Sequence, residues 1–219
     1  SKKSLAKRKL IHGIGVNDAW YTVKPTVNGS RLQCPYYAVW KGMLGRAYSD
    51  NTHTRQPTYI GCSVAKEWLT FSNFRSWMET QDWEEKQLDK DILIPENKEY
   101  GPNACIFVSR DINNLLNDNA ASRGDYPQGV CFRLSSKRCS AQCMVNGKTE
   151  HLGTFNSIKE AECAYLTFKS VLVVSIAYEA EAVSAPKLQE ALLRHADLFK
   201  SRAERVCAEI KRKRSLRDW

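Results

Sequence analysis

The chain has 219 residues, of which 42% are hydrophobic, and 33 basic side chains against 24 acidic ones give a formal net charge of +9. This length and apolar content predict one or two folded domains, and the charge favours a polyanionic partner, nucleic acid above all. No apolar run reaches the length of a membrane span, and no signal-peptide segment follows the basic N-terminus. We therefore expect neither membrane association nor secretion, and a cytoplasmic location.

An arm, a hairpin and a helix are expected first along the chain. Residues 1–17 are basic and contain glycine, so we expect a mobile arm or one that becomes ordered on a partner. Trp20–Val23 and Arg31–Cys34 flank an Asn-Gly turn, which is typical of a β-hairpin. Apolar side chains recur at steps of three and four over Pro35–Tyr48 and predict a helix.

A polar loop containing His53 is expected next. It is followed by a helical region over Val64–Met78, whose aromatic stripe belongs to the core. We expect Leu88–Phe107 to be rich in loops with two short strands, and Ser109–Asn117 to form a short helix. A glycine and a proline mark residues 120–128 as a linker.

Three strands are predicted after the linker, at Val130–Leu134, Cys139–Val145 and Glu150–Phe155. A polar turn separates the first two strands, and Asn-Gly, which tolerates positive φ angles, separates the last two. This order predicts an antiparallel three-stranded sheet. A helix capped by Asn156 or Ser157 then places an apolar stripe over one face of the sheet, and the other face stays open.

The C-terminal part is expected to be helical. The helix after the sheet is predicted to continue through Ala177–Val183. A Ser-Ala-Pro break then precedes a further helix from Lys187 to about Arg214. Residues 184–219 are therefore expected to form a basic C-terminal helix, separate from a sheet domain at 129–183.

The eight cysteines include no Cys-x-x-Cys pair, so we expect them to be reduced and mostly buried. Cys139 and Cys143 have the even spacing that places both on one face of a strand. A zinc site would have to combine the widely spaced residues Cys34, Cys62, Cys105 and His53. Because the short ligand pairs of structural zinc sites are missing, zinc is not predicted.

Basic side chains dominate the strands and turns of the predicted sheet. They outweigh Glu150, the single acid there, and would leave an exposed basic ribbon that fits the width of a DNA groove. These basic residues are Arg133, Lys137, Arg138 and Lys148.

This segment resembles the APETALA/ethylene-response-factor type of DNA-binding domain, which also occurs in bacteriophage proteins. The resemblance lies in Gly129-Val130, Arg138, Ala141, His151–Phe155, Glu160-Ala161 and Ala164-Tyr165. One departure is Cys139, where the family usually has an aromatic residue. The resemblance implies that the sheet enters the major groove.

The same resemblance implies contacts from particular side chains to bases or phosphates. The residues that correspond to the contacting positions are Arg133, Arg138, Gln142 and Lys148. Together with Lys137, they are the predicted nucleic-acid-binding residues.

Polar side chains in the first half suggest a second site. Leu88–Asp91, Tyr100–Cys105 and Asp111–Asn114 place acids, a lysine and amides on a strand, a loop and a helix. Such groups suit a Mg²⁺ or Mn²⁺ site. With the flanking segments Tyr37–Arg46 and Cys62–Phe74, their order and spacing resemble the ββα-metal motif of phage HNH endonucleases.

The HNH resemblance implies a role for each matching residue. Asp89, with Asn113 or Asn114, would hold the metal ion, and Asn103 would brace the loop. Lys90 stands where the family has the histidine that activates water. A lysine near its usual pKa of about 10.4 cannot accept a proton at neutral pH, so unless burial lowers this pKa, Lys90 would instead contact the scissile phosphate or stabilise developing charge.

Two further residues are candidates for this site. Asp91 shares a strand face with Asp89, so it could act as the base or as a second metal ligand. His53 could reach the site from its loop. The same residues are also consistent with a ββα scaffold that binds DNA without cutting it.

The sequence therefore predicts an α+β protein with a degenerate HNH-like domain that contains the ββα element, then a three-stranded antiparallel sheet packed on a helix, and a C-terminal helix. The expected divisions are an arm at 1–17, the HNH-like domain at 18–119, the linker at 120–128, the DNA-binding domain at 129–183 and the helix at 184–219.

The favoured function is that of a phage-type DNA-binding protein related to HNH homing or nicking endonucleases, with Mg²⁺- or Mn²⁺-dependent cleavage as its chemistry. One alternative is a catalytically inactive nucleic-acid-binding regulator. Another is a host- or virion-interaction factor that binds a protein through the C-terminal helix. The expected partner is double-stranded DNA in the cytoplasm of an infected bacterium, and the sequence predicts no oligomeric state.

Overall fold

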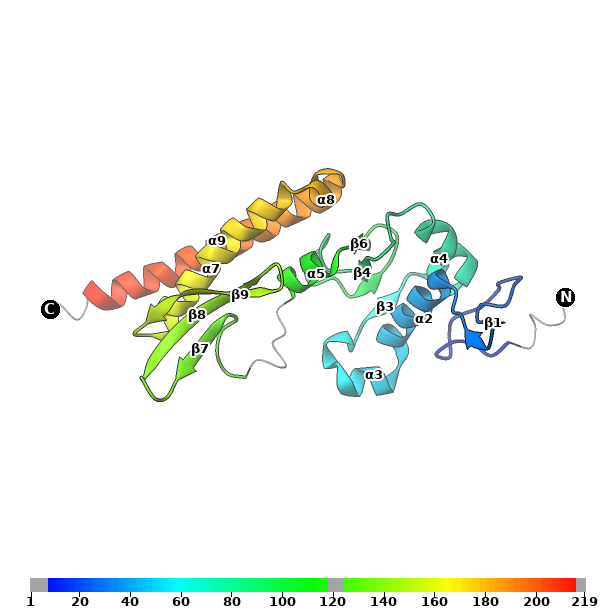
Figure 1. Cartoon of the computed structure of the whole chain (residues 1–219), viewed down its shortest axis with the longest axis horizontal. Coiled ribbons are helices and arrows are strands. Elements are labelled where there is room, and N and C mark those ends of the chain that lie inside the picture. Colours follow the sequence, from blue (N-terminus) through cyan, green and yellow to red (C-terminus); the bar gives the residue numbers. More distant parts are fainter. Residues whose placement is uncertain (1–7, 118–123, 216–219) are drawn as a thin grey trace. The chain divides into compact units, whose positions relative to one another are not determined.

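The computed structural model describes residues 8–117 and 124–215 (Figure 1). The predicted α+β class is confirmed. The chain divides into two compact units, residues 1–109 and 110–219. Within the two described ranges, no helix combines the length and the apolarity that a membrane span requires.

The first unit contains short strands and helices around one core. In chain order these are β1 (Thr26–Val27), β2 (Ser30–Arg31), α2 (Pro35–Tyr48), α3 (Asp50–Arg55), η1 (Pro57–Tyr59), β3 (Ser63–Val64), η2 (Lys66–Leu69), α4 (Phe71–Met78), β4 (Gln87–Asp89), β5 (Glu99–Tyr100) and β6 (Ile106–Val108). β1 pairs with β2 and β4 with β6 in antiparallel fashion, and β3 pairs with β5 in parallel.

The helix predicted at Pro35–Tyr48 is confirmed in full as α2. It begins with a proline, whose missing N–H costs nothing in the first turn. The predicted hairpin is present, but its strands lie directly beside the Asn28-Gly29 turn and not at the more distant segments. The predicted polar loop around His53 is wrong, because α3 and η1 form there. The expected helical region at Val64–Met78 is divided into β3, η2 and α4.

The core of the first unit is aromatic and lies between α2, η2 and α4. Trp40 and Phe74 are 0% exposed and Trp68 is 1% exposed. The indole Nε1 of Trp40 donates a hydrogen bond of 2.7 Å to the backbone oxygen of Trp68. A buried indole N–H needs such a partner, so this bond fixes α2 against η2.

The part of the predicted N-terminal arm that the structure describes is tied to the first unit. Arg8 donates to the backbone oxygens of Asn17 and Ala19, at 3.1 and 2.8 Å. The N–H of Val16 donates to Leu69, and the oxygen of Val16 accepts from Phe71. Residues 8–17 are therefore not the mobile arm that we expected, while residues 1–7 lie outside the described part of the chain.

The second unit is a sheet covered by helices. Its elements are α5 (Arg110–Leu116), β7 (Val130–Arg133), β8 (Arg138–Val145), β9 (Lys148–Phe155), α7 (Ile158–Ala177), α8 (Ala180–Val183) and α9 (Pro186–Ser215). The sheet has the order β7-β8-β9 and is antiparallel throughout, which confirms the predicted three-stranded sheet. Of the predicted linker, residues 120–123 lie outside the described residues.

Helix α7 starts at one of the two predicted caps. The Ser157 hydroxyl accepts the N–H of Glu160 at 3.2 Å, and the Glu160 carboxylate accepts the N–H of Asn156 at 3.2 Å. The arrangement is a variant of the capping box, in which the Glu160 carboxylate accepts the N–H of the residue before the cap. The helix ends at Ala177, so the predicted continuation through Val183 is wrong. Tyr178 leaves the helical conformation and α8 follows as a separate short helix.

Helix α9 lies along α7, as Figure 1 shows. Ala203 and Val206 of α9 belong to the same buried cluster as Val130 and Cys139 of the sheet. The basic C-terminal helix is therefore part of the sheet unit and not the separate element that we expected.

A disulfide between Cys163 and Cys207 joins α7 to α9, with 5.9 Å between their Cα atoms. The prediction that every cysteine is reduced is therefore wrong for this pair. The spacing argument missed it because the two thiols lie 44 residues apart and meet only when the helices pack. Cys139 and Cys143 are free and buried on the same face of β8, as predicted.

Candidate nucleic-acid interface

The sheet of the second unit has one face covered by α7 and one open face. Cys139, Ala141 and Cys143 of β8 point toward α7 and are buried. Because residues paired across antiparallel strands share a face, the strand register assigns the open face. Its side chains are Cys131, Arg133, Arg138, Ser140, Gln142, Met144, Thr149, His151 and Thr154.

Arg133 and Arg138 are direct cross-strand partners on this open face, and both are exposed. None of the nine side chains on the face is acidic. Like charges placed directly opposite each other destabilise a sheet. Arg138 donates through Nη2 to the backbone oxygen of Thr154 at 3.3 Å, which leaves the positive charge without a carboxylate on this face.

Gln142 extends the polar part of the open face, because it is exposed and pairs with His151. The register shifts at Ala141/Gln142, and Gly153 has a φ of +135° at this bulge. The extra residue allows His151 and Thr154 to lie on the same face although they are three positions apart. The sequence reasoning did not select His151 as a contact residue, because strict alternation does not reveal a bulge.

Lys137 and Lys148, the two lysines predicted to bind nucleic acid, do not lie on the open face of the sheet. Lys137 is exposed in the β7–β8 turn, where its φ is +51°. Lys148 pairs with Val145, so it belongs to the side of the sheet that carries Cys143. The structure thus brings Arg133, Arg138 and Gln142 together and places Lys148 on the other face. The two-residue Asn-Gly turn contained the signal for this, because it fixes the Val145–Lys148 pairing.

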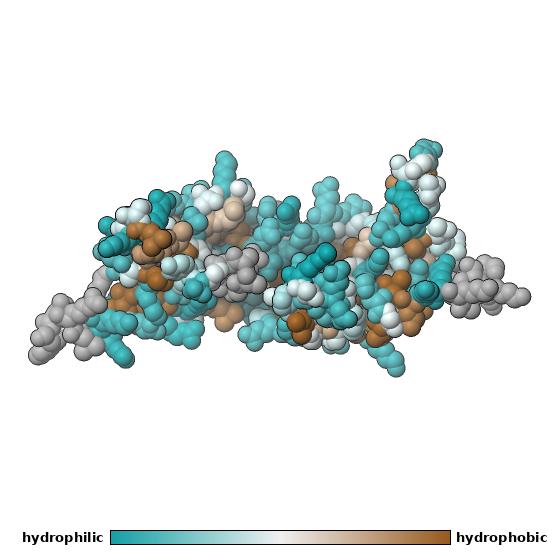
Figure 2. All heavy atoms as spheres, turned by 90° about the horizontal axis from the view of Figure 1, so that it is seen from below, coloured by the Kyte–Doolittle hydropathy of each residue, from teal (hydrophilic) through white to brown (hydrophobic). Residues whose placement is uncertain are grey.

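The surface around these residues is mixed. Figure 2 shows a mostly hydrophilic surface on which hydrophobic side chains form separate groups. Leu134, in the β7–β8 turn, is 84% exposed, and Met144 on the open face is 60% exposed. A sheet face with arginines, an amide and scattered apolar side chains offers both polar and apolar contacts to a base edge.

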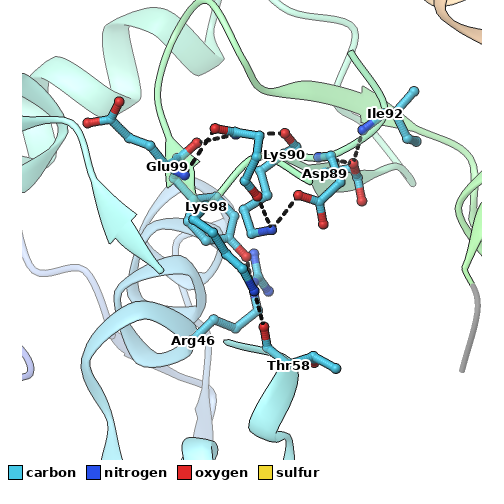
Figure 3. A network of polar contacts seen from close by, with 10 residues as sticks. Arg46, Thr58, Asp89, Lys90, Ile92, Lys98 and Glu99 are labelled. Atoms are coloured by element: carbon cyan, nitrogen blue, oxygen red, sulfur yellow. Dashed lines mark hydrogen bonds and ion pairs between the residues drawn. The ribbon is translucent and has the colours of Figure 1, made fainter. Parts of the chain in front are cut away.

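Asp89, the predicted metal ligand of the first unit, ends β4 and caps the turn that follows it. Its Oδ1 accepts the N–H groups of Asp91 and Ile92, at 2.7 and 2.8 Å (Figure 3). Burial raises the pKa of Asp89, and the two backbone hydrogen bonds partly offset this effect. The carboxylate therefore has a structural role in the turn.

Lys90, the residue in the place of the expected histidine, is 5% exposed. Its ammonium group donates to the Asp91 carboxylate and, at 2.8 Å, to the backbone oxygen of Asn97 (Figure 3). It also lies 5.9 Å from the centroid of the Tyr100 ring. A phosphate contact would require Lys90 to leave these partners.

The expectation that Asp91 shares a strand face with Asp89 is wrong. The strand ends at Asp89, because the Asp89 carboxylate turns the backbone back toward itself. Asp91 then pairs with Lys90 and is half exposed. Strand alternation does not continue past the turn.

Three residues that the sequence reasoning did not select complete this network. The Asn97 amide donates to the backbone oxygens of Lys90 and Glu99, at 2.8 and 2.6 Å. Arg46 donates from Nε to the Tyr100 hydroxyl at 2.9 Å. Burial raises the pKa of Tyr100 far above its usual value. No spacing rule links Arg46 to this network, because it lies 54 residues before Tyr100.

The remaining predicted residues of the nuclease site lie on several different elements. His53 lies on α3, and its Nε2 is 2.9 Å from the backbone oxygen of Arg46. Asn103 is exposed in the turn after β5, and Asn113 and Asn114 lie on α5 in the second unit. Among residues 8–117 and 124–215, no three His, Cys, Asp or Glu side chains gather as metal ligands.

The predicted metal ligands are divided between the two units, with Asp89 in the first and Asn113 and Asn114 in the second. One oxygen of the Asp89 carboxylate already accepts two backbone hydrogen bonds, and Asp91, the possible second ligand, pairs with Lys90. Mg²⁺ needs near-octahedral oxygen coordination. The function proposed first below therefore rests on the sheet.

We expect Asp89→Asn to be at least as stable as the wild type at neutral pH. Burial raises the pKa of Asp89 in the folded protein above its value in the unfolded chain. The folded protein therefore loses stability as the pH rises from the unfolded-state pKa to the folded-state pKa, because the buried carboxyl group gives up its proton. Asparagine keeps the acceptor oxygen without the charge, and its advantage should disappear at acid pH. Urea unfolding followed by tryptophan fluorescence, at neutral and acid pH, measures the difference.

Asp89→Ala serves as the comparison, because it removes both backbone hydrogen bonds and should be destabilising at either pH. An Asn variant that is less stable than the wild type at neutral pH would contradict the assignment.

No family model, curated protein or solved structure matches this chain. The functional argument therefore depends on the side chains themselves. The first unit presents a buried, internally satisfied polar network, whereas the second presents exposed cations on an uncovered face. The second arrangement is the one that is open to a ligand.

Proposed function

We propose that the chain is a nucleic-acid-binding protein that docks double-stranded DNA on the open face of the β7–β9 sheet. The observation that carries this proposal is the cross-strand pair Arg133 and Arg138, exposed on a face without a carboxylate. Two like charges held side by side cost stability in the free protein. A phosphate or a guanine edge between them would offset this cost.

The chemistry of the face fits duplex DNA. A two-stranded β-ribbon has a width that the major groove admits, and arginine contacts the O6 and N7 of guanine through its forked donors. Gln142 adds an amide that can pair with adenine. Lys137 is exposed in the turn at the same end of the strands as the arginine pair, where it would contact a backbone phosphate.

The test is the affinity of the full chain for a short fluorescent duplex, measured by anisotropy at several salt concentrations. We expect affinity to fall steeply with salt, because phosphate contacts release counterions. Arg133→Ala and Arg138→Ala should each weaken binding. Substituting an arginine that contacts a phosphate should lower the slope of affinity against salt concentration by about one. Substituting an arginine that contacts a base should instead reduce the discrimination between sequences by about 1–3 kcal/mol.

Lys148→Ala is the matched control, because it removes one positive charge from the same hairpin on the other side of the sheet. It should change affinity less than either arginine substitution. Equal losses in all three variants would show that only total charge matters. A salt-independent affinity would contradict the proposal, and a preference for structured RNA would change the ligand.

DNA cleavage is the second candidate function, and the order of elements favours it. β4 and β6 form an antiparallel pair, and α5 follows β6 directly in the chain, in the order of a ββα element. The assay is nicking of a supercoiled plasmid with Mg²⁺ or Mn²⁺, beside an EDTA control. Nicking that is lost in Asp89→Asn would support a nuclease, and intact plasmid with retained binding would support recognition alone.

A further inference from the structure

The helix pair α7 and α9 contains an apolar groove of about 540 Å³ that is lined by residues of these two helices. Ser170 on α7 and Ala196 and Ala203 on α9 are buried and form its floor. Val171 and Val174 form a wall on α7, and they are 66% and 40% exposed. The face therefore presents a ridge of valines beside a channel floored by small side chains.

The groove is held in shape by contacts between the two helices. The Cys163–Cys207 disulfide fixes one end, and Arg202 pairs with Glu162 at 2.8 Å near it. At the other end, the Gln189 amide donates to the backbone oxygen of Ala177 at 2.9 Å. A surface that is rigid before association loses less entropy when it binds a partner.

Charges alternate along the α9 side of the groove. Asp197, Lys200 and Glu204 lie on one face of the helix and line the groove. All three are exposed, and none makes an ion pair or a side-chain hydrogen bond with another described residue. The groove thus has an edge of unpaired charges in the order negative, positive, negative.

We propose that this groove is the interface of a homodimer, in which a second copy of the chain packs its own α7–α9 face against it. A two-fold axis between Lys200 and Glu204 would set each lysine against the glutamate of the other copy. The same axis would place the valine ridge of each copy against the small-residue channel of the other. The buried Ala203 between these charges allows the two helices to approach closely.

The second copy is favoured over an unrelated partner because the face is complementary to itself. It contains a ridge and a channel, and a cation one helical turn from an anion, so two identical faces satisfy each other. This inference is independent of the proposed nucleic-acid function.

The test is the association state of the full chain by sedimentation velocity over a range of concentrations. The wild type should be a dimer. Lys200→Glu and Glu204→Lys should each raise the dimer dissociation constant by about tenfold or more, because two-fold symmetry repeats each lost pair and adds like charges. An equimolar mixture of these two variants should form a heterodimer, and the double variant should dimerise again.

Arg205→Glu is the matched control, because it makes the same charge reversal on an exposed residue of α9 that does not line the groove. It should remain a dimer. Val171→Glu changes an exposed side chain, so it should fold and be monomeric. A monomeric wild type, or a mixture of the charge variants that does not associate, would overturn the proposal.

Discussion

Gly129→Ala is expected to destabilise the second unit by about 2–5 kcal/mol, because overpacking costs about 1–3 kcal/mol and a left-handed residue with a side chain about 1–2 kcal/mol. Gly129 precedes β7 and has a φ of +73°. A methyl group there would overlap the ring of Tyr165 and lie 2.7 Å from the backbone oxygen of Gln142. Tyr165 is 3% exposed, and the Gln142 N–H donates to Gly129, so neither neighbour can move freely.

Gly147→Ala separates the clash from the backbone strain. Gly147 has nearly the same φ, +74°, but a methyl group there meets nothing within 4 Å. It should cost about 1–2 kcal/mol, the ordinary penalty for a left-handed residue with a side chain. Calorimetry, with hydrogen exchange of the β8 and β9 amides to locate the loss, measures both variants. Equal losses would mean that Tyr165 does not pack against β7.

Trp40→Ala is expected to cost the first unit about 3–5 kcal/mol. Trp40 is fully buried on α2, with its ring centroid 5.4 Å from that of Phe71 and 5.7 Å from that of Tyr37. Truncation leaves a cavity and also removes the donor to the Trp68 backbone oxygen. A buried carbonyl without a partner adds to the loss.

Trp20→Ala is the control, because Trp20 is 88% exposed, and its removal should change stability by about 0.5 kcal/mol or less. Trp40→Phe should lie between the two, because it keeps most of the packing but not the hydrogen bond. Circular dichroism in urea suits these variants, since each change removes a fluorophore. A mild effect of Trp40→Ala would contradict the packing described for α2.

Local patterns in the sequence were sufficient for several elements of the fold. The spacing of apolar residues after Pro35 predicted α2, and the Asn-Gly pairs predicted the two hairpin turns. The Ser157 cap and the stripe of the helix that follows it were also predictable. These elements share one property, because the forces that define them act between residues close in sequence.

Other features depend on contacts that no local pattern contains. Whether Lys90 is buried or exposed is decided by Asn97 and Tyr100, which reach it only after the chain has turned at Asp89. The pairing of Cys163 with Cys207 likewise depends on how two helices pack. The predicted nuclease site treated Asp89, Lys90 and Asp91 as a continuous strand, and the end of β4 at Asp89 changed the direction of each side chain after it.

The ties between the N-terminal segment and α4 set a limit on where the first unit can be shortened. Asp18 accepts hydrogen bonds from the N–H and, through its second oxygen, the hydroxyl of Ser72 in the first turn of α4, at 2.9 and 2.5 Å. This carboxylate thus performs the capping for a helix that begins 53 positions later and has no side-chain cap of its own. A fragment that keeps all the elements from β1 onward but lacks residues 8–18 would therefore lose the cap of α4 and be less stable, so the first unit should be shortened no further than Arg8.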